Sequence, residues 1–293
     1  MKVALTGATG FIGSHVLTEL QEHGHEVTAL IRDDPRADVV ATRGATPAVV
    51  DLYDRPAVAS LLSKADGAIH TASPGDATSA DLDSALADAV IDAFAGSGKP
   101  YVSISGLWVY GANSAISEES PLDAPALVAW KEPIERRVLG ESDVRGVVIV
   151  SSVAYGDDGG AIPGVLLGSP RDDADNLIML GTGQQHWSMV HVADLADVFR
   201  RVLEDDLAHG RYVIGNGVNS SVAELTEAAA VAAGAPGAVP GSDNEARARL
   251  GDYFAEVLLL DQGTDAAKAR AELGWYPSHP ALVDEFRHGS YRK

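Results

Sequence analysis

Short apolar runs alternate with amphipathic stretches through the first half of the chain. The runs have the length and β-branched content of buried strands, and the stretches between them carry apolar residues at helical spacing. The predicted strands are 2–6, 26–31, 47–50, 67–70, 100–105 and 145–150, and the predicted helices are 10–23, 55–62, 81–95 and 125–139. This alternation is typical of βαβ units with right-handed crossovers. It predicts an α/β fold, a doubly wound parallel sheet of the Rossmann type with two mononucleotide-binding halves.

The pattern changes after residue 150. Residues 156–170 are rich in Gly, Asp and Pro without a clear period, which is typical of a loop that shapes a substrate site. The later predicted elements are strands 188–192 and 211–214, and helices 193–203, 221–233, 245–252 and 266–273. We therefore expect a dinucleotide-binding domain at 1–150, to which 188–216 returns. Residues 151–187 and 217–293 are expected to form a smaller, mostly helical substrate-binding subdomain.

Composition narrows the possible partners and chemistry. The 293 residues include 42 acidic and 22 basic side chains, a formal net charge of −20 that repels nucleic acids and anionic membranes. No run reaches the roughly 18 apolar residues of a membrane span, and the N-terminus has no signal-peptide pattern, so we expect a cytoplasmic protein. The chain has no cysteine, and its histidines and carboxylates show no metal-ligand spacing. We expect no metal, and any redox chemistry must come from a cofactor.

A glycine motif follows the first predicted strand. It reads Thr6-Gly7-Ala8-Thr9-Gly10-Phe11-Ile12-Gly13 and opens an amphipathic helix. Gly7 permits a tight turn, Gly10 lets the backbone approach a diphosphate, and Gly13 allows close packing of helix on strand. The amides of a helix N-terminus attract an anion. The motif therefore predicts dinucleotide binding, with cofactor contacts from Gly7, Thr9, Gly10, Phe11, Ile12 and Gly13.

The end of the second predicted strand bears on the choice of nucleotide. Arg32 stands there, and a guanidinium at this point accommodates the 2′-phosphate of NADP, whereas a carboxylate such as Asp33 would bind the ribose of NAD. We predict NADP as the cofactor, with NAD possible. Other residues at strand ends are expected to line the same crevice, namely Asp51, Leu52, Thr71, Ala72 and Ser73.

With further motifs along the chain, the sequence resembles the extended short-chain dehydrogenase/reductases, also called the NAD-dependent epimerase/dehydratase family. The motifs are the glycine motif, His70-Thr71-Ala72, Ser103-Ile104-Ser105, Val109-Tyr110-Gly111, Val190-His191-Val192-Ala193-Asp194-Leu195 and Glu272-Leu273-Gly274-Trp275. Arg32 is similar to the NADP-preferring reductases of this family. The resemblance implies a nicotinamide cofactor, a small-molecule substrate held by the C-terminal part, and a homodimer formed through helices 81–95 and 125–139.

The sequence departs from this family at the catalytic pair. The family uses Tyr-x-x-x-Lys, and Lys131 matches the lysine, but Leu127 stands where the tyrosine is expected. On a helix the two would share one face, so Leu127 would meet the substrate without being able to donate a proton. Pro133 is expected to bend this helix. The resemblance implies that Lys131 binds the nicotinamide ribose and that Ser105 hydrogen-bonds the substrate.

Other residues could supply the proton or contact the ligand. Tyr110, Tyr155, His186, His191 or water are the candidate donors, and the first three are also expected in the substrate pocket. Ser151 and Ser152 stand where relatives often have Arg-Pro-Gly, and would contact the nicotinamide carboxamide. The missing arginine argues against a sugar-nucleotide substrate.

Three functions fit these residues. The first is an NADPH-dependent oxidoreductase that transfers hydride to a small carbonyl, imine or activated alkene. The second is an epimerase or dehydratase that retains its cofactor, and the third is a catalytically silent NADP-binding sensor or scaffold. Because hydride addition to an iminium needs no proton at the acceptor atoms, the missing tyrosine favours C=N substrates.

Overall fold

The computed structural model describes residues 1–292 and divides the chain into two compact units. The first unit comprises Met1–Ser105, Trp130–Ile149 and Leu195–Tyr212. The second comprises Gly106–Ala129, Val150–Asp194 and the chain from Val213 onward. Residues 106–129 thus belong to the second unit, although the sequence pattern places them in the first domain.

The large sheet has seven strands in the order β10-β6-β5-β4-β1-β2-β3. Its strands are β1 (Lys2–Thr6), β2 (Glu26–Ile31), β3 (Thr46–Val49), β4 (Gly67–His70), β5 (Pro100–Gly106), β6 (Arg145–Ser151) and β10 (Gly210–Ile214). The first strand pairs in parallel with β2 on one side and β4 on the other, so the strand order reverses beside β1. This is the switch point at which doubly wound folds bind ligands. The predicted Rossmann fold is confirmed.

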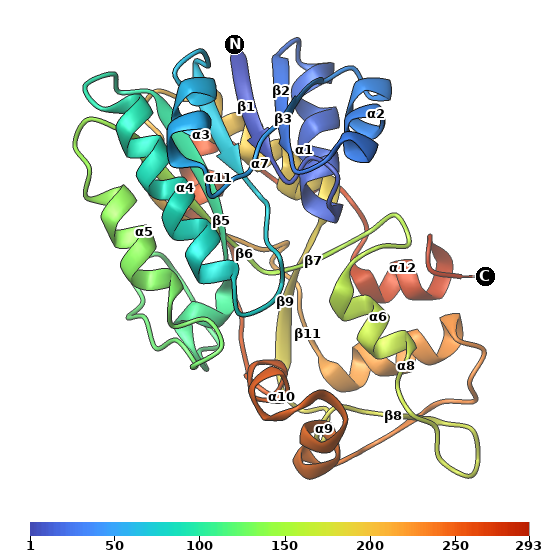
Figure 1. Ribbon diagram of the computed structural model, residues 1–293. Coiled ribbons are helices and arrows are strands. Elements are labelled where there is room, and N and C mark those ends of the chain that lie inside the picture. The colour runs from blue at the N-terminus through green and yellow to red at the C-terminus, as the bar shows by residue number, and fades with distance from the viewer. Residues whose placement is uncertain (293) are drawn as a thin grey trace. The chain divides into compact units, whose positions relative to one another are not determined.

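Helices connect the strands of the first unit. They are α1 (Phe11–Glu22), α2 (Asp34–Thr42), α3 (Arg55–Leu62), α4 (Ser79–Phe94), α5 (Lys131–Leu139) and α7 (Val192–Glu204). Figure 1 shows α3, α4 and α5 side by side. Helix α2 was not predicted, because its only buried residue is Val40 and the apolar period is therefore weak. Its signal is at its start, where Asp33 caps the helix and Pro35 follows in the first turn.

The helix predicted at 125–139 is wrong at its N-terminal end, because α5 begins only at Lys131. The backbone N–H groups of Val128 and Ala129 both donate to the carbonyl of Pro125, at 2.9 and 3.0 Å, which closes a turn before the helix. Leu127 lies in this turn and shares no helical face with Lys131. The expected bend at Pro133 is also wrong. As the third residue of α5, Pro133 occupies the first turn, where a backbone N–H has no partner within the helix.

The second unit contains two small sheets. The sheet β11-β9-β7 joins Asn219–Ser221, His186–His191 and Val153–Tyr155, and the sheet β12-β8 joins Ala238–Val239 and Leu177–Ile178. The strand predicted at 188–192 therefore does not return to the large sheet as expected. It pairs in parallel with β7 and antiparallel with β11, and only β10 joins the large sheet.

The helices of the second unit are short. They are the 3-10 helix η1 (Leu107–Tyr110) and the α-helices α6 (Ala161–Leu167), α8 (Val222–Ala232), α9 (Asp243–Leu250), α10 (Asp252–Leu258), α11 (Ala267–Leu273) and α12 (Leu282–His288). The stretch 156–170, predicted as loop, includes α6. Gly160 precedes this helix and Pro163 occupies its first turn, so the two residues that suggest a loop mark a helix start instead.

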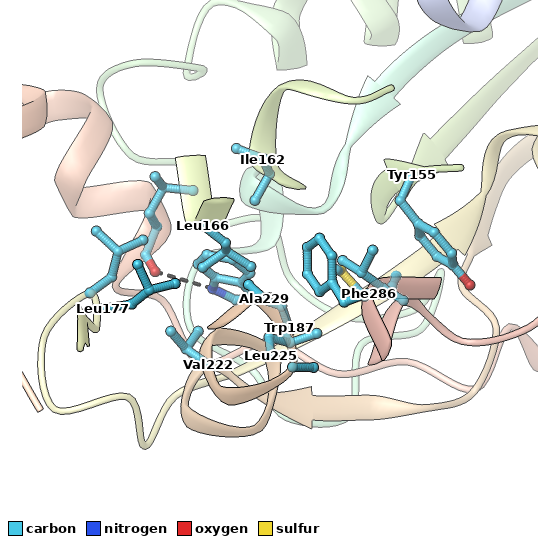
Figure 2. Packing of buried hydrophobic residues seen from close by; sticks show 14 of the residues in the cluster. Tyr155, Ile162, Leu166, Leu177, Trp187, Val222, Leu225, Ala229 and Phe286 are labelled. Atoms are coloured by element: carbon cyan, nitrogen blue, oxygen red, sulfur yellow. Dashed lines mark hydrogen bonds between the residues drawn. The ribbon is translucent and has the colours of Figure 1, made fainter. Parts of the chain in front are cut away.

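Aromatic side chains organise the core of the second unit (Figure 2). Trp187 of β9 packs among Leu225, Phe286 and their neighbours, and its indole N–H donates to the carbonyl of Leu258 at 3.1 Å (Figure 2). Tyr155 lies in the same core with no exposed surface. Burying large side chains of this kind, with their polar atoms bonded, holds β7, β9, α8 and α12 together.

Among residues 1–292, no helix combines the length and the apolar content that crossing a bilayer requires.

Candidate functional site

The turn between β1 and α1 is built so that only glycine fits. Gly7 has a φ of +78°, and a Cβ atom there would lie 2.6 Å from the backbone nitrogen of Ala72. A Cβ atom on Gly13 would lie 2.1 Å from the carbonyl oxygen of Gly7. The N–H of Gly10 donates to that same carbonyl at 2.8 Å. The turn is therefore pressed against the end of β4, and α1 is packed against the turn.

The first turn of α1 leaves its backbone donors for a ligand. Gly10 at the N-cap has no side chain to bond them, and no acidic residue occupies the first turn. Unbonded N–H groups and the positive end of the helix dipole together attract an anion such as a diphosphate.

A cleft of about 610 Å³ opens over this turn within the first unit. This volume is in the range of small-molecule and cofactor sites. The lining includes the following residues predicted from the sequence: Gly7, Thr9, Gly10, Arg32, Asp51, Leu52, Thr71, Ala72 and Ser73. Phe11, Ile12 and Gly13, the first three residues of α1, are not among the lining residues.

Arginines define one part of this cleft. Arg32 and Arg36 both line it, whereas Asp33 does not. The Asp33 carboxylate accepts a hydrogen bond from the backbone N–H of Arg36 at 3.3 Å, caps α2 and forms an ion pair with the Arg36 guanidinium. The Asp33 carboxylate is therefore bonded to residues of α2. Arg36 was missed because α2 was missed, and the available signal is the Asp33 cap followed by Pro35, which places Arg36 in the first turn of a helix.

Further cleft residues were also missed by the sequence reasoning. Tyr53 and Thr78 line the cleft, and the Tyr53 hydroxyl donates to the Thr78 carbonyl at 3.4 Å. Asp76 lines it too, and hydrogen bonds from the side chain and backbone of Thr78, with the nearby charge of Arg32, hold its pKa below the ordinary value. No sequence motif marks these residues, since they come from the loops after β3 and β4.

Lys131 and Ser105 lie at the end of β5. The Lys131 ammonium donates to the carbonyl of Ile104 at 3.4 Å and pairs with Asp83 at 3.2 Å. Ser105 is 4% exposed, and its hydroxyl has no hydrogen-bond partner among the residues described. An unsatisfied buried hydroxyl is unfavourable, so a native protein that retains one needs a reason to do so.

A buried polar chain connects the end of β1 to Lys131. Thr6 Oγ1 lies 2.7 Å from His70 Nδ1, and His70 Nε2 lies 3.1 Å from Asp83 Oδ1. Burial opposes the charge of Asp83, but the hydrogen bond to His70 and the charges of His70 and Lys131 outweigh it and hold the pKa of Asp83 below its ordinary value. The sequence reasoning missed Asp83 as a functional residue.

The remaining predicted residues belong to the second unit. Tyr155 is buried, its hydroxyl donates to the Pro280 carbonyl at 2.6 Å, and burial raises the pKa of its phenol. This position does not fit a proton donor or a substrate contact. Tyr110 is buried in η1, and His186 is half exposed at the start of β9, where it pairs with Asp261 at 2.9 Å.

The two serines after the sixth strand differ in their bonding. The Ser151 hydroxyl donates to the Ser152 carbonyl at 2.7 Å, whereas the Ser152 hydroxyl is buried without a partner in the described chain. Neither lines the cleft over the glycine turn. Their contact with a nicotinamide carboxamide stays a prediction.

Within residues 1–292, no three side chains of the metal-binding types come together as a metal site.

A glycine turn at the switch point, a helix N-terminus and an arginine-lined cleft define a Rossmann protein that binds a dinucleotide. A family model described as NAD(P)H-binding matches residues 7–206, and the chain belongs to this family, as an extended short-chain dehydrogenase/reductase of the epimerase/dehydratase type. The predicted class of NAD(P)-dependent oxidoreductase is confirmed.

Similar proteins match along nearly the whole chain. An uncharacterised protein of Schizosaccharomyces pombe is 25% identical over 99% of this chain and 100% of its own length. A 3-diazoavenalumate denitrifying reductase of a Streptomyces species is 27% identical over 97% of this chain and 98% of the relative. The crystal structure of human epimerase family protein SDR39U1 with NADPH is 24% identical, with a TM-score of 0.75 over 99% of each chain.

Proposed function

We propose that the protein is an NADPH-dependent reductase that transfers hydride to a small carbonyl, imine or activated-alkene substrate. The observation that carries this proposal is the pair Arg32 and Arg36 on the cleft, with Asp33 engaged in capping α2. Two guanidinium groups suit a 2′-phosphate, and neither Asp33 nor Asp34 is among the cleft-lining residues that would have to bind the ribose of NAD. The similarity to a reductase and to a structure that holds NADPH supports the same direction.

The cleft supplies the diphosphate and 2′-phosphate contacts of the proposed cofactor, whereas the roles of Lys131 and Ser105, which are not among its lining residues, rest on the family resemblance. Amides at the start of α1 bind the diphosphate, and Arg32 and Arg36 bind the 2′-phosphate. Lys131 binds the nicotinamide ribose, and the Ser105 hydroxyl donates a hydrogen bond to the substrate oxygen or nitrogen. When bound, the reduced nicotinamide supplies the hydride.

The proposed substrate accepts hydride without a well-placed proton donor. A positioned general acid contributes roughly 10²–10⁴ in rate. Residue 127 is a leucine in a turn, and the phenol of Tyr155 is buried and bonded to the Pro280 carbonyl. An iminium accepts hydride without a proton, so C=N compounds lead the substrate classes.

Calorimetry with NADPH and NADH, followed by NADPH oxidation against a carbonyl, imine and enone panel, tests the proposal. Arg32→Ala is expected to weaken NADPH binding about tenfold or more, the usual scale for a charge-assisted bond, and to leave NADH binding nearly unchanged. Arg43→Ala is the matched control, because Arg43 is exposed at the C-cap of α2, the helix that follows Arg32, and lies outside the cleft lining. Equal loss of both nucleotides, or tighter binding of NADH by the unaltered protein, would contradict the NADP assignment.

Two other functions, an epimerase or dehydratase that retains its nucleotide and a silent sensor, must be distinguished from the proposed reductase. The human structural relative bears the name of an epimerase family protein, which favours an enzyme that retains its nucleotide. Release of NADP after each turnover would exclude an enzyme that retains its nucleotide. A silent sensor would bind NADPH tightly, consume none with any substrate, and show the same behaviour with Lys131→Ala.

Assembly as a homodimer through α4 and α5 is also a proposal. The outward residues Asp88 and Asp92 of α4 form ion pairs with Arg55, and Asp88 also pairs with Arg137 of α5. A dimer interface on this face would therefore include these charged side chains. Light scattering of the unaltered protein and of Arg137→Glu would test it, since a charge reversal at this face would dissociate such a dimer.

A further inference from the structure

Lys131 is held by a carboxylate that the sequence motifs do not mark. Its ammonium lies 3.2 Å from Asp83 Oδ2, and the other oxygen of the same carboxylate lies 3.1 Å from His70 Nε2. His70 in turn lies 2.7 Å from Thr6 Oγ1 at the end of β1. All four residues belong to the first unit. The pair Asp83–His70 thus links Lys131 to the strand that carries the glycine turn.

This arrangement is shielded from solvent. The side chains of His70, Asp83 and Lys131 are 3%, 14% and 19% exposed. A cavity of about 20 Å³ beside them is lined by these three residues and by Ser103 and Glu135 among others. Electrostatic attraction is stronger in such surroundings than at an open surface, and loss of one partner leaves the other charge poorly solvated.

The start of α5 makes a negative partner necessary. Lys131 is the first residue of this helix, where the positive end of the helix dipole disfavours an ammonium. Asp83 supplies the opposite charge. Two of the three N–H bonds of Lys131 are directed to Asp83 and Ile104, which leaves one for a ligand.

We propose that Asp83, held in place by His70, is a positioning residue that fixes the Lys131 ammonium at the end of β5. A lysine side chain has four rotatable bonds, so an unanchored ammonium would lose much of its binding energy for the nicotinamide ribose to ordering. The proposal rests on the proposed function in one respect, which is the role of Lys131 toward the cofactor.

Asp83→Asn tests the anchor. Asparagine has nearly the same volume but no negative charge, so the ion pair with the Lys131 ammonium is lost even where a neutral hydrogen bond remains. Asp88→Asn is the matched control, because Asp88 lies on the same helix and pairs with Arg55 and Arg137 at its outer surface. The acylation rate of Lys131 in the nucleotide-free protein, followed by peptide mass spectrometry, reports its anchoring without any enzymatic activity.

The expected result is an acylation rate of Lys131 about fivefold higher in Asp83→Asn and unchanged in Asp88→Asn, a change on the scale of one ion pair. Calorimetry should show NADPH binding weakened severalfold in Asp83→Asn, and Asp83→Glu should restore both quantities in part. An unchanged acylation rate in Asp83→Asn would overturn the proposal. If that variant does not fold, His70→Gln must raise the acylation rate in the same direction, and its failure to do so would overturn the proposal equally.

The two proposals fail in different ways. If Asp83→Asn releases Lys131 but Lys131→Ala binds NADPH as the unaltered protein does, the anchor stands and the assigned role of Lys131 is wrong. If Lys131→Ala loses NADPH affinity while Asp83→Asn changes neither the acylation rate nor the affinity, the role of Lys131 stands and the anchor is wrong.

Discussion

The substitution Gly13→Ala tests how the glycine turn is assembled. Gly13 lies in α1 with an ordinary helical backbone, so alanine suits its conformation. The added Cβ atom, however, would lie 2.1 Å from the carbonyl oxygen of Gly7 and 2.6 Å from the side-chain oxygen of Thr71. Real Cβ contacts below 3.0 Å essentially do not occur. Because the nearest atom is backbone and cannot rotate away, α1 and the turn must separate.

Two effects of opposite sign set the magnitude. Alanine in place of glycine in a helix interior gains about 1 kcal/mol in helix propensity. Overpacking against a rigid neighbour costs about 1–3 kcal/mol and occasionally more, and the contact with the Gly7 carbonyl is close enough for the upper part of that range. The expected net loss is about 1–2 kcal/mol, which corresponds to a fall in Tm of roughly 2–3 °C for a chain of this size.

Thermal unfolding followed by circular dichroism measures the loss, and calorimetry with NADPH measures binding. We expect affinity to fall about tenfold or more, because separation of α1 from the turn displaces the amides that face the diphosphate. Gly164→Ala in α6 is the matched control, since a Cβ atom there meets nothing within 4 Å, and this variant should gain about 0.5–1 kcal/mol. A Gly13→Ala protein as stable as the unaltered one, with unchanged affinity for NADPH, would refute this reasoning.

Two other predictions concern a hydroxyl and an imidazole. Ser105→Ala removes a buried hydroxyl that has no partner in the described chain, so stability should stay level or rise by up to about 1 kcal/mol, while NADPH oxidation with the best substrate falls about tenfold or more. A large drop in Tm, or an unchanged rate, would show that the hydroxyl is not kept for a ligand. His191 stacks on His279 with ring centres 4.1 Å apart, and burial first, then the neighbouring imidazole, lowers the pKa of His191 below 6.5. The unfolded chain therefore takes up the proton first as pH falls, so the stability that neutral His191 contributes is present above about pH 6.5 and is lost as pH drops through the folded-state pKa. Tm should decline from about pH 7 to about pH 5, and His191→Gln should decline less over the same range. Equal slopes for the two proteins would contradict this.

The features predicted from the sequence are those with local causes. The glycine turn, the strands on either side of it in the sequence and the arginine at the end of β2 depend on residues close together in the chain. The alternation of predicted strands and helices indicates the class of fold in which they stand. Arg36 and α2 were missed because apolar periodicity is a poor guide to a helix with one buried residue. Its cap at Asp33 was the stronger signal.

The polar chain of Thr6, His70, Asp83 and Lys131 could not be predicted in the same way. Asp83 is 13 residues from His70 and 48 from Lys131, and nothing in the local sequence selects it over Asp81 or Asp88 on the same helix. The choice is made by the face of α4 that packs toward β4 and α5. Partners of this kind depend on the tertiary structure.

The start of α5 shows how a different interpretation of one residue changes the chemistry inferred. Taken as a helix interior residue, Pro133 suggests a bend and leaves Leu127 and Lys131 on one face, in the positions of the family's tyrosine and lysine. Taken as a first-turn residue, it predicts that the helix begins near Lys131, as it does. An ammonium at that end of a helix is opposed by the dipole, so a nearby carboxylate would be expected on physical grounds. Asp83 of α4 meets this expectation, because its carboxylate lies 3.2 Å from the Lys131 ammonium.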